Sequence, residues 1–265
     1  NALTGANVRR IFQYMDGLGR PIQSSQVEQS PTSKDIVTYQ QYDQYGRESK
    51  LYIPYTATTN SGTYRTDAAT AQTTFANTWG AGGYGYSETR FEASPLNRVL
   101  EQAAPGATWR MGLGHTGEFT YRGNTTTEAV RDFTNNNSFA ADKLFVVEST
   151  DENERKKYTY TDKLGRVVMV KQQMATNPTI EDDHYARTYT VYDDFGRVAA
   201  VIPPEAAKKM KTSGSWDWTL STYASMIYKY VYDSRGRLTS KTIPSAGTTS
   251  IAYDRLGRPV LTTDA

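Results

Sequence analysis

Few side chains in this sequence have the types and spacing that chemistry requires. Gly112-x-Gly114-x-x-Gly117 has the spacing of a dinucleotide-binding loop. That loop must follow a strand and open a helix, because the helix N-terminus binds the pyrophosphate. Here the segment 118–121, Glu-Phe-Thr-Tyr, follows and alternates like a strand. We therefore expect no nucleotide site.

Metal and nucleophile chemistry have little more support. Glu181-Asp182-Asp183-His184 offers carboxylate and imidazole ligands, but one His beside three acids is more typical of an exposed loop. His115 has no Ser and Asp that the sequence identifies as triad partners. The chain has no Cys, which excludes a disulfide framework and a thiolate site. We predict no catalytic, cofactor-binding or metal-binding residues, no cofactor, and no enzymatic activity.

Composition favours a β-rich and open fold. Hydrophobic residues make up 37% of the 265 residues, and Tyr is unusually frequent, with 20 Tyr against 8 Phe and 4 Trp. Tyrosine suits half-buried pleated surfaces, where the ring packs and the hydroxyl stays wet. The 30 basic and 28 acidic residues balance to +2, so no nucleic-acid partner is expected. No apolar run is long enough to span a membrane.

The elements that position these residues follow from an internal repeat. One six-residue motif, which we call the hexad, appears six times. It consists of a first residue, usually apolar or aromatic, then Asp, two variable residues and Gly-Arg. The copies are Met15–Arg20, Tyr42–Arg47, Thr161–Arg166, Tyr192–Arg197, Tyr232–Arg237 and Tyr253–Arg258. A seventh, degenerate copy is Phe91–Arg98, in which Glu92 replaces Asp, Asn97 replaces Gly, and the turn is two residues longer. Such repetition indicates a repeat architecture.

The hexad has the chemistry of a hairpin turn. Asp at the first turn position and Gly at the fourth favour a type I turn, and a left-handed Gly closes it with a bulge. The Asp carboxylate can accept from backbone N–H groups two or three residues on. The predicted repeat-turn residues are Asp16, Gly19, Arg20, Asp43, Gly46, Arg47, Glu92, Arg98, Asp162, Gly165, Arg166, Asp193, Gly196, Arg197, Asp233, Gly236, Arg237, Asp254, Gly257 and Arg258. We expect positive φ at each Gly of this set.

The Arg of the hexad has two interpretations. It can stack on the Tyr of the neighbouring repeat and pair with Asp, which is a structural role. It can also form a ladder that binds a ligand. Regular repetition serves stacking first, so we favour the structural role.

Insertions separate the hexads. Thr66 or Asp67 can cap a helix to about Trp79. Residues 203–205, Pro-Pro-Glu, can open a second helix through about Lys211, and residues 213–215, Ser-Gly-Ser, end it. Residues 222–227 form a third candidate helix. We expect an all-β fold, a curved antiparallel sheet of repeat hairpins with two or three short inserted helices. Two regions are predicted: 1–150, with helical and Gly-rich insertions, and 151–265, a continuing array truncated at the carboxy end.

At this point the residues resemble a known family. The Tyr-Asp-x-x-Gly-Arg copies resemble the YD repeats of Rhs proteins. The segments 91–100 (FEASPLNRVL), 202–206 (IPPEA), 215–216 (SW) and 16–21 (DGLGRP) are similar to the amino-terminal part of Bacteroidota Rhs-type proteins. The resemblance covers essentially the whole chain.

The resemblance implies a much longer, exported parent protein, at the bacterial cell surface or secreted. Family members build a spiral of β-strands that can enclose a variable carboxy-terminal toxin. Their conserved core and self-cleavage aspartates lie near the carboxy end of that shell, and nothing in this sequence matches them. The implied function is a non-catalytic structural segment of the shell. Its implied partners are the remainder of its own parent chain, an enclosed toxin or a surface glycan.

Two alternatives remain open from the sequence. The first is a carbohydrate-binding module that stacks sugars on exposed Tyr and Trp, with Trp79, Trp109, Trp216 and Trp218 as candidates; an enzyme is the weaker alternative. The strand at 260–263, Val-Leu-Thr-Thr, is also expected to have an open edge, which would favour weak self-association.

Overall fold

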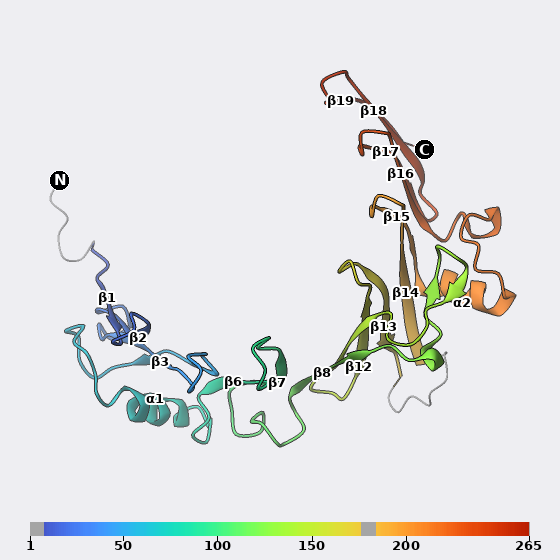
Figure 1. Ribbon diagram of the computed structural model, residues 1–265. Helices are drawn as coiled ribbons and strands as arrows, with labels where there is room; N and C mark the ends of the chain where they lie inside the picture. The colour runs from blue at the N-terminus through green and yellow to red at the C-terminus, as the bar shows by residue number, and fades with distance from the viewer. Residues whose placement is uncertain (1–7, 176–183, 265) are drawn as a thin grey trace. The chain divides into compact units, whose positions relative to one another are not determined.

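The computed structural model describes residues 8–175 and 184–264, which divide into two compact units (Figure 1). Unit 1 comprises residues up to Phe119 together with Thr150–Glu154, and unit 2 comprises Thr120–Ser149 and the residues from Arg155 onward. The units therefore divide the chain elsewhere than the regions 1–150 and 151–265, which were defined by repeat content and stay a prediction.

Unit 1 is an antiparallel sheet of three hairpins. Its strands are β1 (Ile11–Met15), β2 (Pro21–Gln26), β3 (Ile36–Gln41), β4 (Lys50–Tyr52), β5 (Tyr55–Thr56), β6 (Tyr86–Phe91), β7 (Val99–Ala103) and the first residues of β8 (Gly117–Gly123). The hairpins β1–β2, β3–β4 and β6–β7 each have one hexad at the tip, and the pairings β2–β3 and β4–β6 join them side by side.

One helix, α1 (Ala68–Asn77), covers part of the sheet of unit 1. Its residues Ala71 and Phe75 pack against a small core of Val37, Tyr55 and Ala57. The helix lies within the predicted span, but the predicted cap is wrong in its chemistry. Asp67 occupies the N-cap position without a capping hydrogen bond, because its carboxylate pairs with Arg65 at 2.9 Å instead.

Unit 2 stacks four hairpins in one antiparallel sheet. The strands of this sheet are the end of β8, β11 (Phe145–Thr150, as far as Ser149), β12 (Lys156–Thr161), β13 (Val167–Gln173), β14 (Tyr185–Tyr192), β15 (Val198–Ile202), β16 (Tyr228–Tyr232), β17 (Leu238–Ile243), β18 (Gly247–Tyr253) and β19 (Pro259–Thr263). Strands β9 (Arg131–Asp132) and β10 (Asn137–Ser138) pair with each other in a separate two-stranded sheet. The hairpins run in order from β12–β13 to β18–β19, and each has a hexad at its tip. The pairings β13–β14, β15–β16 and β17–β18 join them.

Helix α2 (Pro204–Ser213) packs beside β14 and closes the larger core (Figure 1). Pro204 opens the helix and Gly214, at φ 72°, ends it, as the sequence predicts. Ala206, Ala207 and Met210 are buried against strand residues of unit 2. The third predicted helix is only one 3-10 turn, η4 (Ser221–Tyr223); another such turn, η2 (Thr126–Glu128), follows β8.

The predicted fold class is confirmed. Antiparallel strands make up most of the regular secondary structure in the described residues, with two inserted α-helices, α1 and α2. None of the helices in the described parts of the chain has the length and apolar character needed to cross a bilayer.

Candidate functional site

The hexads build the same turn wherever the regular sequence occurs. In each, the Gly N–H donates to the Asp carbonyl oxygen at 2.9–3.1 Å, and the Asp N–H donates to the Arg carbonyl oxygen at 2.8–2.9 Å. The Asp carboxylate accepts from the backbone N–H two residues on and from that of the Arg four residues on, at 2.8–3.0 Å. The sequence predicted donors two or three residues after the Asp, so the second N–H donor lies one residue farther along the chain than predicted.

The predicted positive φ is confirmed at all six glycines. The values are 75° at Gly19, 78° at Gly46, 80° at Gly165, 77° at Gly196, 78° at Gly236 and 85° at Gly257. In the degenerate copy, Asn97 takes the same left-handed position at φ 51°. Glycine and asparagine tolerate this region best, so the exchange keeps the turn.

Each Arg also pairs with the Asp of its own hexad. In the six regular copies the Arg Nε donates to Asp Oδ2 at 2.7–2.8 Å. In the degenerate copy the longer Glu92 reaches Arg98 across the longer turn, with Oε2 accepting from Nη2 at 2.7 Å. The hydrogen bonds from the Arg side chain and then from Ser94 lower the pKa of Glu92 to about 2. The backbone N–H of Arg20, Arg237 or Arg258 likewise lowers the pKa of Asp16, Asp233 or Asp254.

The hairpins are joined by the first residue of the hexad. Where that residue is Tyr, its hydroxyl donates to the carbonyl of the residue that follows Gly-Arg in the preceding hairpin. The bonds are Tyr42 to Pro21 at 2.8 Å, Tyr192 to Val167 at 3.0 Å, Tyr232 to Val198 at 3.0 Å and Tyr253 to Leu238 at 2.8 Å. We call this contact region between successive hairpins the junction.

The Arg of the preceding hairpin completes the junction. Its guanidinium lies over the aromatic ring of the next hexad: Arg20 over Tyr42 (4.3 Å to the ring centroid), Arg47 over Phe91 (4.9 Å), Arg166 over Tyr192 (4.8 Å), Arg197 over Tyr232 (4.6 Å) and Arg237 over Tyr253 (4.6 Å). In three junctions its Nη1 also donates to the backbone carbonyl of the next hexad's acid, at 3.2 to 3.4 Å. The structure thus shows the stacking role that we favoured for the Arg.

In the later hairpins the Arg of the preceding hairpin also lies close to the glycine, and at Gly46 the approach is tight. A Cβ on Gly46 would lie 3.0 Å from Nη1 of Arg20, and one on Gly236 would lie 3.5 Å from Nη1 of Arg197. A Cβ on Gly19 or Gly165 would meet no atom within 4 Å. Those two glycines belong to the first hexad of each unit, where no Arg from a preceding hairpin of the same unit reaches the turn.

The same rule explains the variation in the first hexad residue. Met15 and Thr161 begin the first hexads of units 1 and 2, whereas the regular hexads that follow begin with Tyr. Within its unit, a first hexad has no preceding hexad Arg to place over a ring. The sequence shows that Met or Thr stands in place of Tyr at these two positions. The reason for the replacement is seen only from the order in which the hairpins of each unit are stacked.

Exposed apolar residues at the hairpin tips of each unit were missed by sequence reasoning. The residue immediately before the left-handed position is apolar or aromatic in six of the seven copies, and it is 63–84% exposed: Leu18, Tyr45, Leu96, Leu164, Phe195 and Leu256. Arg235 is the exception. The signal was present in the repeat alignment, because turn tips usually have polar residues.

A partly buried polar cluster in unit 2 was also missed. Glu128 accepts from Arg122 at 2.7 Å, from the Tyr160 hydroxyl at 2.8 Å and from the Thr125 N–H at 2.7 Å. Burial opposes ionisation of Glu128, but these donors outweigh it and lower its pKa to about 2. Burial, and then the bond to Glu128, raise the pKa of Tyr160. The members of this polar cluster come from distant parts of the sequence, so no local motif marks the cluster.

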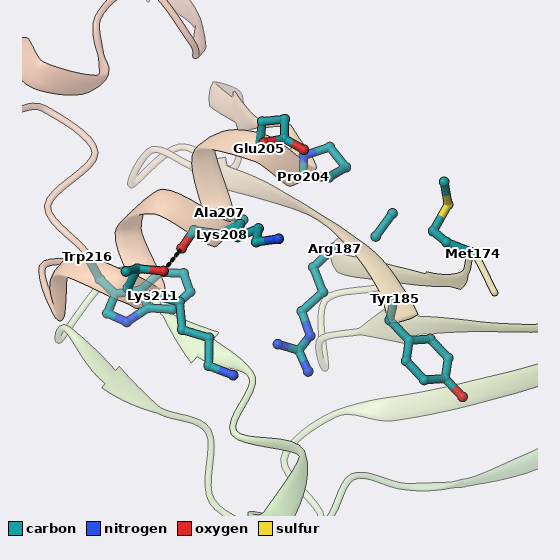
Figure 2. Close-up of a pocket in the computed structure, with 11 residues that line it drawn as sticks. Met174, Tyr185, Arg187, Pro204, Glu205, Ala207, Lys208, Lys211 and Trp216 are labelled. Carbon is teal, nitrogen blue, oxygen red and sulfur yellow. Dashed lines mark hydrogen bonds between the residues drawn. The ribbon is translucent and has the colours of Figure 1, made fainter. Parts of the chain in front are cut away.

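A pocket beside α2 brings aromatic side chains and cations together. It has a volume of about 510 Å³ and is lined by Tyr185, Arg187, Lys208, Lys211 and Trp216, among others (Figure 2). Trp216 is not a flat exposed platform, because its ring packs edge-on against Phe133 and Tyr189.

The other candidate residues are dispersed. Trp218 packs partly buried against the core of unit 2, while Trp79 is 65% exposed beside Phe75 and Trp109 lies against His115. Gly117 begins strand β8 rather than a helix. Residues 181–183 of the acidic segment lie outside the described residues. Within residues 8–175 and 184–264, no three His, Asp or Glu side chains group as metal ligands would.

Two family models match parts of the chain, one at each end. A family model described as RHS Repeat matches residues 232–265, and one described as Domain of unknown function (DUF6443) matches residues 1–123. Among curated proteins, none matches the chain.

Solved structures share the fold over 97% of the chain. The crystal structures named TcdB2-TccC3-Cdc42 and TcdB2-TccC3-TEV are similar with TM-scores of 0.61 and 0.63 at 18% and 17% identity. A Photorhabdus luminescens Tc holotoxin pore structure is similar with a TM-score of 0.59 at 16% identity. The chain spans only 11% of the length of each of those chains. The repeat match and the shared fold together support an Rhs-type repeat protein.

Proposed function

We propose that this chain is a non-catalytic structural segment of an exported Rhs-type protein, and that its hairpins form part of the wall of a β-shell. The observation that supports this most is the junction: the same Arg–ring contact recurs between successive hairpins in both units. A contact that repeats with the sequence repeat builds a wall, because each hairpin is stabilised by its neighbours.

The location and contents of the shell belong to the same proposal. The solved structures to which the chain is similar belong to Tc toxin assemblies, and the chain matches 11% of their length. This supports a longer parent protein, secreted or at the bacterial cell surface, whose Rhs shell encloses a carboxy-terminal toxin.

The test uses the full-length polypeptide that contains this chain, with an epitope tag at its carboxy end. Arg197→Ala combined with Tyr232→Ala removes one junction completely. We expect protease to degrade the tagged end faster in this variant than in the wild type, while Leu164→Ser at an exposed tip has no effect. Equal degradation rates in the wild type and the junction variant would contradict enclosure by this wall. Recovery of the protein only from the cytoplasm would contradict export.

Carbohydrate binding is the second candidate, supported by the pocket beside α2. Tyr185 and Trp216 supply aromatic surface, and the neighbouring cations supply hydrogen-bond donors (Figure 2). A glycan array on the wild type and on Trp216→Ala tests it, with Trp79→Ala as the control. A sugar that binds the wild type and the control but not Trp216→Ala would favour the binding module, provided that circular dichroism shows Trp216→Ala to be folded. We expect no such sugar, and no turnover on a panel of hydrolase substrates.

A further inference from the structure

The pocket beside α2 has an unbalanced charge. Its described lining includes three basic side chains, Arg187, Lys208 and Lys211, and one acidic side chain, Glu205. Three positive charges against one negative charge give this lining a net charge of +2. Figure 2 shows the Arg187 guanidinium and the Lys211 ammonium extending into the same space, one from strand β14 and the other from helix α2. Two separate elements therefore supply the positive charge of the pocket.

The neighbouring strand adds a further cation behind this lining. Lys171 of β13 is the cross-strand partner of Arg187, and like charges at paired positions destabilise a sheet. The Lys171 ammonium lies 4.2 Å from the centroid of the Tyr185 ring, which lines the pocket. Burial, and then the charge of Arg187, lower the pKa of Lys171. An anion bound at Arg187 would relieve this repulsion.

The rest of the lining is largely apolar. Tyr185 and Trp216 provide aromatic surface, and Met174 and Pro204 provide aliphatic surface. The volume of about 510 Å³ lies in the range of small-molecule sites. An inorganic anion has the size of only a few water molecules and would leave most of this space unfilled. The pocket therefore fits a ligand that combines an anionic group with an apolar body.

We propose that the pocket beside α2 binds a phosphate monoester with an aromatic body. The phosphate group pairs with Arg187 and Lys211, and the body lies against Tyr185 and Trp216. A phosphate monoester carries a charge of about −1.5 to −2 at pH 7, which matches the lining, whereas a carboxylate or a sulfate ester carries a single charge. Arginine can bind two phosphate oxygens at once, and lysine adds a compact charge.

This proposal goes beyond the structural role of the chain, because a shell wall needs no ligand. It also differs from the carbohydrate candidate for the same pocket, because a neutral sugar has no charge for the cations to match. Arg187, Lys208 and Lys211 interact with other groups of the protein as well, so the ligand adds to those interactions.

Calorimetric titration of the protein with three small probes tests the proposal. Phenyl phosphate has the dianion and the ring, phenyl sulfate keeps the ring with a single charge, and glycerol phosphate keeps the dianion without a ring. We expect phenyl phosphate to bind at least about ten-fold more tightly than either of the others. Equal binding of phenyl sulfate would overturn the charge match, and equal binding of glycerol phosphate would overturn the aromatic body. No binding of phenyl phosphate at millimolar concentration would overturn the whole proposal.

Two variants change the charge of the pocket in opposite directions. Lys211→Gln should weaken the binding of phenyl phosphate about ten-fold, because it removes one of the two cations that hold the phosphate group. Glu205→Gln removes the acidic side chain of the described lining and should strengthen binding about three-fold. A variant that fails to fold cannot bind more tightly, so unchanged or weaker binding in Glu205→Gln would contradict the proposal.

Lys157→Gln is the control for the overall charge of the protein. Lys157 is an exposed residue of β12 and does not line the pocket. The control should bind phenyl phosphate as the wild type does. Equal losses in Lys157→Gln and Lys211→Gln would mean that binding follows the net charge, and the proposed site would be wrong.

The acidic residues Glu181, Asp182 and Asp183, which lie outside the described residues, supply the last arm. We expect the wild type to bind phenyl phosphate without any change to these residues. Binding that occurs only after all three are replaced by their amides would overturn the proposal, because the cations of the pocket would then serve the protein's own carboxylates. Each of these failures leaves the protease test of the shell wall unaffected, so the two proposals can fail separately.

Discussion

The junction between the second and third hairpins of unit 1 differs from the junctions of unit 2, yet the Arg occupies the same place in both. Arg47 lies over Phe91, which has no hydroxyl, and donates to the Glu92 carbonyl at 3.2 Å and to the Asn97 side-chain oxygen at 3.1 Å. Arg237 lies over Tyr253 and donates to the Asp254 carbonyl at 3.4 Å.

The comparison separates the fixed parts of the junction from the replaceable ones. The ring, the backbone carbonyl and a left-handed turn residue occur in both junctions, so they define the contact. The hydroxyl is absent from the unit 1 junction, where the Asn97 amide gives the guanidinium another acceptor. Asparagine can do this because it tolerates positive φ and also has a side-chain oxygen.

Acid should have the largest effect, because it acts on all of these turns together. The carboxylates that the Arg residues hold have lowered pKa values in the folded state, about 2 for Glu92 and Glu128. Their contribution to stability is complete above the unfolded pKa of about 4 and is lost as the pH falls towards the folded pKa. We expect the fluorescence of Trp216 and Trp218 to report unfolding of unit 2 in this window.

Glu128→Gln is the matched variant for the acid experiment. The amide cannot titrate, so the variant should be less stable at neutral pH and should lose less stability on acidification. An unchanged pH dependence in Glu128→Gln would show that this carboxylate does not contribute to the acid transition.

Gly196→Val should have the next largest effect. A β-branched residue at φ 77° costs about 1–2 kcal/mol in the left-handed region. Gly196→Asn copies the residue of the unit 1 turn and should cost only a few tenths of that. Denaturant unfolding followed by Trp fluorescence measures both free energies. Equal costs for Val and Asn would mean that backbone strain is not what selects Gly here.

Arg197→Ala should destabilise unit 2 by about 1–2 kcal/mol, because it removes the contact with the Tyr232 ring and a bond to the Asp233 carbonyl. Arg258→Ala is the control, since it removes an Arg with the same ion pair and no ring among the described residues. It should behave as an ordinary surface substitution. If the two variants unfold alike, the ion pair within the hexad matters more than the junction.

Tyr232→Phe should have the smallest effect, about 1 kcal/mol or less, because it removes only the bond to the Val198 carbonyl. The variant reproduces the ring of the unit 1 junction without its Asn97. Adding Gly236→Asn should then recover part of the loss by supplying an acceptor for Arg197. Double-mutant analysis of the unfolding free energies measures this coupling, and strictly additive effects would contradict it.

The sequence by itself determined the hairpins, because a turn depends on a few adjacent residues. Asp at the first position and Gly at the fourth position of each regular turn predicted the tips, and the φ values in the structure agree. Pro204 and Gly214 similarly marked the ends of α2, since their backbone preferences are local. The Arg–Tyr stacking was also predicted in outline, because repetition implies contact between neighbours.

Only the tertiary structure decided which partner each side chain meets. Asp67 pairs with Arg65 instead of capping α1, and Trp216 packs into the core of unit 2 instead of facing solvent. The order of hairpins within each unit explains why Met15 and Thr161 stand where the other regular hexads have Tyr. Glu128, Arg122 and Tyr160 converge only after β8, η2 and β12 assemble. Such contacts join residues far apart in the chain, so local propensity does not specify them, and the free energy of packing and hydrogen bonding selects them instead.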